Sequence, residues 1–144
     1  MKTALVSFVA VGCLAPAAWS QSFNIDVGNA TPTPGATYGA AAGSAGVWNT
    51  YVGGVQAGLL GLNGSATGVG MSGTGGFLGG YNDPGTFGDD EALMDDSLLI
   101  PFAETYTVSG LAAGLYDVYV YTWTFTVLST DVQVNGQGFQ AIGG

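Results

Sequence analysis

Ten carboxylates dominate the chemistry that this chain can perform. From Thr3 to Gly144 the sequence has no Lys, Arg or His, so no side chain in that range can neutralise them. Five of the ten fall between Gly88 and Asp96. Crowded carboxylates without a protein cation stay in water, hold protons or bind a metal ion from outside. The sequence therefore directs attention first to cation binding in this acidic stretch.

The acidic stretch has oxygen ligands of the hard kind that suit calcium. Its spacing does not fit an EF-hand loop, which needs acids at alternate positions and a Gly at the sixth. If residues 90–96 are helical, Glu91 and Asp95 lie one turn apart on one face, and Asp89 can join them from the preceding loop. A solvated acidic loop is the alternative. The predicted calcium ligands are Asp89, Asp90, Glu91, Asp95 and Asp96.

A row of aromatic side chains forms the second candidate site. On a strand, Tyr119, Tyr121 and Trp123 point to one face at intervals of roughly 7 Å. Aromatic rings can stack on sugar rings, and Tyr and Trp add a polar group. The row therefore predicts binding to a polysaccharide or cell-surface glycan. Packing of the same row into the core is the alternative.

The missing residue types exclude most enzyme classes. Beyond Lys2 the chain has no His or Lys, so no Ser or Thr there has a base of these types to activate it, and the sequence has no phosphate-binding loop or zinc ligand set. Glycoside hydrolysis needs only two carboxylates, but it also needs a deep cleft and neighbours that raise the pKa of one of them. We therefore expect a protein that is not an enzyme. The negative charge also argues against nucleic acid and anionic membrane partners.

The first twenty residues have the layout of a secretory signal peptide. Lys2 precedes an apolar run, and small residues stand before Gln21. A buried N-terminal helix and lipoprotein processing at Cys13 are the alternatives. Cleavage would leave ten acids and no bases, a net charge of −10, in one domain over residues 21–144. The sequence thus predicts a secreted or cell-surface protein, and no later segment is long enough to predict membrane insertion.

The elements that must position these residues are expected to be strands. Gly, Val, Thr and Tyr are frequent, and short alternating segments are separated by turn residues. One or two helical turns are expected within Asp90–Leu98, and long loops over Gly28–Gly46 and Gly73–Gly88. Asn-Gly pairs at Asn63 and Asn135 predict hairpins with both residues at positive φ. The predicted strands are Phe23–Val27, Leu59–Leu62, Ser65–Ser72, Glu104–Val108, Leu115–Leu128 and Asp131–Val134.

The alternation over Leu115–Leu128 predicts which side chains the fold buries. Val118 and Val120 share a face with Tyr116, opposite the aromatic row. We expect the valine face to be buried between two sheets. The predicted fold class is all-β, an antiparallel β-sandwich with one short acidic helix.

The pattern resembles a family. The run from Thr105 through Ser109-Gly-Leu-Ala-Ala-Gly-Leu-Tyr-Asp-Val-Tyr-Val-Tyr121 to Val132-Gln-Val-Asn-Gly136 is similar to the second half of secreted bacterial jelly-roll modules of the galactose-binding-like type. Phe23–Gly28 and Val47-Trp-Asn49 resemble the first half of the same modules. The resemblance implies a jelly-roll sandwich, sugar binding and a structural calcium. These modules continue with further strands beyond the Asn-Gly turn, so we expect a sandwich truncated at the C-terminus, which is either a shortened fold or a fragment with an unpaired edge.

These observations predict a secreted, non-catalytic carbohydrate-binding or surface-recognition module, stabilised by calcium. The alternative is a structural module of an extracellular matrix or surface layer without a small ligand. An exposed aromatic row would favour recognition, and a buried row would favour the structural role.

Overall fold

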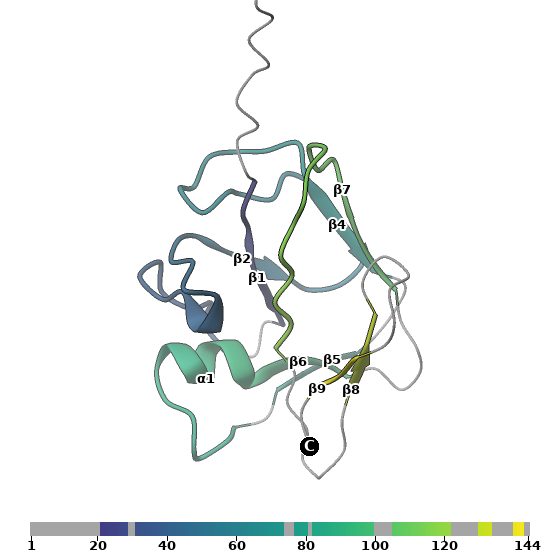
Figure 1. The fold of residues 1–144 in the computed structure, drawn as a ribbon. Helices are drawn as coiled ribbons and strands as arrows, with labels where there is room; N and C mark the ends of the chain where they lie inside the picture. The colour runs from purple at the N-terminus through teal and green to yellow at the C-terminus, as the bar shows by residue number, and fades with distance from the viewer. Residues whose placement is uncertain are drawn as a thin grey trace, which may run out of the picture.

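Short strands dominate the computed structural model, which describes residues 21–28, 31–73, 77–80, 82–99, 105–121, 130–133 and 140–142 (Figure 1). The predicted signal peptide lies outside these residues. In chain order the elements are β1 (Asn24–Val27), the 3-10 turn η1 (Ala40–Ala42), β2 (Trp48–Tyr51), β3 (Val55–Gln56), β4 (Gly70–Gly73), β5 (Phe77–Gly80), α1 (Asp89–Met94), β6 (Asp96–Leu99), β7 (Tyr106–Ser109), β8 (Thr130–Val132) and β9 (Gln140–Ile142). The predicted all-β character, with one short acidic helix, is confirmed at this level.

The described strands are antiparallel in part. They form an antiparallel sheet of order β3-β4-β7 and two antiparallel pairs, β5 with β6 and β8 with β9. By contrast, β1 and β2 run parallel, with Asn24 opposite Trp48 and Val27 opposite Tyr51. A parallel pair needs a long crossover, and the loop over residues 28–47 supplies it. The expectation of a purely antiparallel fold is therefore wrong for this pair.

The core lies where β2 meets the hairpin that precedes β4. Tyr51, Leu59 and Val69 are fully buried. The ring of Tyr51 packs edge-to-face on that of Tyr106 of β7, with centroids 6.2 Å apart. Gly73 passes close to both rings, since a Cβ at this position would lie 2.5 Å from Tyr106 Cε1 and 2.8 Å from the Tyr51 hydroxyl. Only glycine therefore fits at the end of β4.

A buried amide organises the backbone next to this core. Asn49 of β2 is 7% exposed. Its Nδ2 donates to the carbonyls of Asn24 (3.1 Å) and Leu60 (2.8 Å), and its Oδ1 accepts from Leu60 N at 2.7 Å. One side chain thus ties β1, β2 and the residue-60 segment together. Buried polar groups of this kind are stable only when they are hydrogen-bonded, as these are.

The predicted hairpin at Asn63-Gly64 is present with a different turn. Leu60 and Ala66 form the bridge, and Gly64 N donates to Gly61 O at 2.8 Å. Gly64 has a φ of 79°, whereas Asn63 is not at positive φ. The turn is therefore a longer loop that ends in a left-handed glycine, instead of the predicted two-residue turn. Asn63 Oδ1 instead caps the turn by accepting from Ser65 N at 3.0 Å.

Several other sequence predictions are confirmed. Strand β1 lies within Phe23–Val27, β7 overlaps Glu104–Val108, and β8 overlaps Asp131–Val134 and pairs antiparallel with β9. The turn predicted at Asn135 lies outside the described residues. The helix begins at Asp89, but it ends at Met94 and gives way to β6. No helix in the described ranges has the length and apolar character needed to cross a bilayer.

Two predictions about strands are wrong. The stretch Gly73–Gly88, predicted as a loop, contains β5, which pairs with β6. Residues 115–121, the described part of the strand predicted over Leu115–Leu128, belong to none of the described sheets. Val118 is 57% exposed and Val120 is 38% exposed, so the predicted burial of the valine face is also wrong for the described structure. An alternating segment forms a strand only where a neighbouring strand hydrogen-bonds to it. None of the described strands pairs with this segment.

Candidate functional site

The acidic stretch is positioned by the short helix α1. Gly88 precedes it with a φ of 64°, and Asp89, Asp90 and Glu91 occupy its first turn. Negative side chains are favourable there because the unpaired backbone N–H groups create a partial positive charge. Ala92 is the buried residue of the helix, whereas Asp89 and Glu91 are partly exposed and Asp90 is exposed. This placement offsets part of their mutual repulsion without any basic residue.

Asp89 and Asp90 both hold the loop over residues 35–38. Gly35 N donates to Asp89 Oδ1 at 2.7 Å, and the Tyr38 hydroxyl donates to Asp90 Oδ1. The hydrogen bond to Asp90, with burial and the charges of Asp90 and Asp89, raises the pKa of Tyr38 to about 12. A hydroxyl that donates to a carboxylate resists ionisation, because the ionised form would lose the bond and face a like charge.

Asp95 has a different role at the other end of the helix. It is 3% exposed, and its two oxygens accept from Asp83 N (3.1 Å) and Thr86 Oγ1 (2.9 Å). These bonds fasten the loop over residues 83–86 to the end of α1. Asp95 therefore faces a segment other than the one that Asp89 and Asp90 hold.

The predicted calcium ligands are therefore divided among several neighbourhoods. Glu91 lies beside a cavity, described below, and Asp96 is in β6 opposite Gly80. Within the described residues, no three acidic, Cys or His side chains gather closely enough to hold a metal ion. The calcium site stays a prediction.

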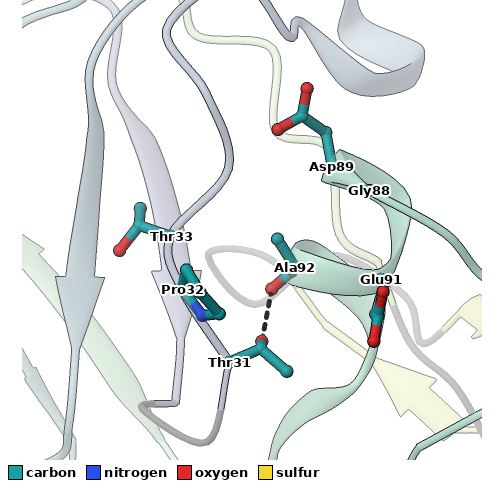
Figure 2. A pocket seen from close by; sticks show the side chains of 7 residues that line it. All are labelled: Thr31, Pro32, Thr33, Gly88, Asp89, Glu91 and Ala92. Carbon is teal, nitrogen blue, oxygen red and sulfur yellow. Dashed lines mark hydrogen bonds between the residues drawn. The ribbon is translucent and has the colours of Figure 1, made fainter.

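A shallow cavity of about 250 Å³ lies between α1 and the loop over residues 31–33 (Figure 2). Thr31 Oγ1 donates to the carbonyl of Ala92 at 3.0 Å and closes one side of it. Asp89 and Glu91 lie on the helix side, and Pro32 and Thr33 on the loop side (Figure 2). The cavity offers hydroxyl and carboxylate oxygens, and its lining includes no aromatic or basic side chain.

The segment from Leu111 to Tyr121, here called the aromatic segment, presents large apolar side chains to solvent. In Figure 1 it runs from the β7 end of the molecule toward the end that holds α1 and β6. Near its start, Ala112 N donates to Gln21 Oε1 at 2.7 Å. Tyr119 is 58% exposed, and the large apolar residues exposed with it are Leu111, Leu115, Tyr116, Val118 and Val120. These side chains leave apolar area in contact with solvent, the kind of surface on which contacts with a partner form.

The end of the aromatic segment meets the loop held by Asp89 and Asp90. The Tyr121 hydroxyl accepts a hydrogen bond from Ala42 N at 3.1 Å. Tyr121 is also close enough to Tyr38 to contribute to its raised pKa. The ring of Tyr38 stacks on that of Trp48, with centroids 6.0 Å apart and planes 27° apart, and Trp48 Nε1 donates to Tyr38 O at 3.0 Å. We call this group the Tyr38 cluster: Tyr38, Trp48, Asp89, Asp90 and Tyr121.

The Tyr38 cluster joins residues from both predicted sites. Asp89 and Asp90 come from the predicted metal ligands, and Tyr121 comes from the predicted aromatic row. Tyr119 is exposed, and Trp123 lies outside the described residues. Aromatic faces beside carboxylates can bind a ring that also bears hydrogen-bond donors or a positive charge.

Tyr38 was missed by reasoning from the sequence, and Trp48 was named there only as part of the resemblance to jelly-roll modules. The available signal was weak. Tyr38 is the single aromatic residue in the stretch of small and turn-forming residues over 28–46. Turn formation does not require an aromatic side chain in such a loop, so its presence could have marked Tyr38 as a candidate for another role.

Comparison with known proteins adds no family: no protein-family model, curated protein or solved structure matches this chain.

Proposed function

We propose that this protein is a secreted, non-catalytic recognition module, built on a jelly-roll-type β-sandwich, that binds a polysaccharide or cell-surface glycan through aromatic side chains. The exposure of Tyr119 on the aromatic segment is the observation that supports this proposal most directly. A half-exposed tyrosine ring loses little hydration of its hydroxyl when its face stacks on a sugar ring. Recognition without catalysis also fits a chain that lacks imidazole and has no amine beyond Lys2 and the chain terminus.

The aromatic segment is held at Ala112, Tyr116 and Tyr121, while residues 117–120 between the last two are exposed. Gln21 holds Ala112 and Tyr116, with Oε1 accepting from the Tyr116 hydroxyl at 3.3 Å, and Ala42 N holds the Tyr121 hydroxyl. A binding surface fixed in this way is partly ordered before the ligand arrives, which reduces the entropy lost on binding. Tyr119 lies between the last two attachment points and is the residue whose ring we expect the ligand to cover.

Glycan binding by the full chain without its signal peptide tests the proposal. Tyr119→Ala should weaken binding to a retained glycan by about tenfold, the loss expected for one stacking contact. Leu115→Ala is the matched control, because Leu115 is fully exposed in the same segment but has no ring. Failure of every glycan on an array to bind, or equal losses for both variants, would contradict the proposal.

A second candidate is the structural module, with another protein chain covering the segment. Leu115, Val118 and Val120 favour it, because aliphatic side chains exposed beside the tyrosines suit a protein contact as well as a sugar. Sedimentation over a range of concentrations separates the candidates. A recognition module stays monomeric and binds glycans, whereas a structural module assembles and is dispersed by Val118→Asp.

A further inference from the structure

The Tyr38 cluster brings two kinds of chemistry to one place. Its rings, those of Tyr38, Trp48 and Tyr121, offer flat faces, and Asp89 and Asp90 offer carboxylates from the first turn of α1. The three aromatic residues and Asp89 are each partly exposed as whole residues, and Asp90 is exposed. The cluster is therefore reachable from solvent.

The carboxylates of the cluster keep capacity to bind more donors. Within the described residues, Asp89 accepts from Gly35 N and Asp90 accepts from the Tyr38 hydroxyl, in both cases through Oδ1. An ionised carboxylate has about four acceptor sites, so one hydrogen bond uses a small part of them. Donors that approach from solvent can add to these bonds without displacing the loop.

The charge of the whole chain decides which donors are attracted. Residues 3–144 have ten carboxylates and no Lys, Arg or His. The field around such a protein attracts cations and repels anions, and an aromatic face adds a further attraction for an ammonium group. A neutral sugar can only stack on the aromatic rings and gains nothing from the charge. A sulfated or uronic-acid polymer is repelled.

We propose that the Tyr38 cluster binds amino sugars in their protonated form, so that the glycan of the proposed function is a polymer of glucosamine-type units. This inference rests on the proposed function and adds the ligand class. The ammonium group lies against Asp89 and Asp90, and the sugar ring lies on the exposed aromatic faces. N-acetylation removes the positive charge and therefore most of the preference.

Binding of short glucosamine oligomers to the full chain without its signal peptide tests the proposal, with N-acetylglucosamine oligomers of equal length and a polyuronate as comparisons. Binding is measured by calorimetric or fluorescence titration. The pH is kept below the pKa of the sugar amine and above the range in which carboxylates take up protons. We expect the glucosamine oligomer to bind roughly fivefold or more tightly than its acetylated form, since one ion pair near water contributes about 1 kcal/mol. The polyuronate should not bind.

Two variants separate the cluster from general charge attraction. Asp90→Asn keeps an oxygen to accept from Tyr38 and should weaken binding of the glucosamine oligomer roughly fivefold. Asp83→Asn changes the net charge equally and keeps an acceptor for Gly85 N, and it should change binding by less than about twofold. Equal losses in the two variants would overturn the assignment to the cluster.

The remaining outcomes distinguish this inference from the proposed function. If acetylated and free oligomers bind equally and Tyr119→Ala weakens both, glycan recognition stands and the preference for amino sugars is wrong. If neither oligomer binds while another array glycan does, the ligand class is wrong. If no glycan binds at all, the proposed function fails and this inference fails with it.

Discussion

The β1–β2 region around Asn49 and the aromatic segment differ in which side chains they expose to water: the first buries polar groups, and the second exposes apolar ones. Around Asn49, polar groups are buried and satisfied by one amide that bonds to two neighbouring segments. In the aromatic segment, apolar side chains such as Leu115 and Tyr119 are exposed, and the hydrogen bonds lie near its ends. The first arrangement stabilises the fold, because each buried bond would be costly to lose. The second contributes little to folding and leaves its apolar area for a partner.

Hydropathy alone does not predict which of these two regions is buried. The more apolar of the two regions is the exposed one, and the region that holds the chain together contains Asn24, Asp26 and Asn49 as buried polar residues. A substitution should therefore affect stability in the first region and binding in the second.

The largest expected effect is the loss of the Asn49 side chain. Asn49→Ala removes three hydrogen bonds and leaves the N–H and carbonyl of Leu60 without this partner, so the free energy of unfolding should fall by about 2–4 kcal/mol. Asn63→Ala is the control, because Asn63 is exposed and bonds only within its own turn in the described structure, and it should cost about 1 kcal/mol or less. Urea unfolding measures both, and equal costs would contradict the role of Asn49.

A smaller effect should appear at high pH through Tyr38, which stands between the two regions. Its pKa is about 12 in the folded state and about 10 when unfolded. Its contribution to stability is therefore complete below about pH 10 and is lost as the pH rises toward 12, because the folded state holds the proton more tightly. Wild type should exceed Tyr38→Phe in stability at neutral pH, and this difference should shrink between those values.

Unfolding midpoints for the two proteins from neutral pH to about pH 12 check this, since both share the other tyrosines. Asp90→Asn is a useful companion because it removes the charge near Tyr38 and keeps an acceptor. A difference that stays constant over the whole range would show that the Tyr38–Asp90 bond does not exist in solution.

Val118→Asp should have almost no effect on stability. Val118 is 57% exposed, so an aspartate there remains in water and should change the free energy of unfolding by no more than about 0.5 kcal/mol. Val69→Asp is the matched control: Val69 is fully buried, and an unpaired charge in its place should prevent folding. If Val118→Asp also prevents folding, the aromatic segment is a buried strand, as its alternation predicts, and the comparison drawn above fails.

Calcium is expected to have the smallest effect. Asp95 accepts its hydrogen bond from a different segment than Asp89 and Asp90 do, so the rise in melting temperature that calcium gives beyond sodium at equal ionic strength should be small. An ion bound by three or four of the predicted ligands would instead add about 2.7 kcal/mol at a hundredfold excess over its Kd. A calcium-specific rise of several degrees, abolished by Asp95→Asn with Asp96→Asn, would establish the site predicted from the sequence.

Local patterns gave the elements that carry a signal of their own in the sequence. The first strand and the acidic helix start at Asp89 follow from alternation and helix polarity, and the Asn63-Gly64 pair marked a hairpin whose turn is longer than the predicted one. The glycine-rich strand β5 was missed because Gly79 and Gly80 carry no side-chain pattern. Local preference also cannot show that this stretch pairs with β6 on the far side of α1.

By itself, the sequence determined the chemistry of this protein: acidic, without a base in residues 3–144, β-rich, with one acidic helix start and one tyrosine-rich segment. Tertiary structure alone decided where these parts meet. The parallel pairing of β1 with β2, the division of the five clustered carboxylates and the meeting of Tyr38 with Asp90 and Tyr121 depend on contacts between residues far apart in the chain. The physical reason is that a carboxylate or a ring accepts many partners of similar strength, and only the packing of the whole chain selects one of them.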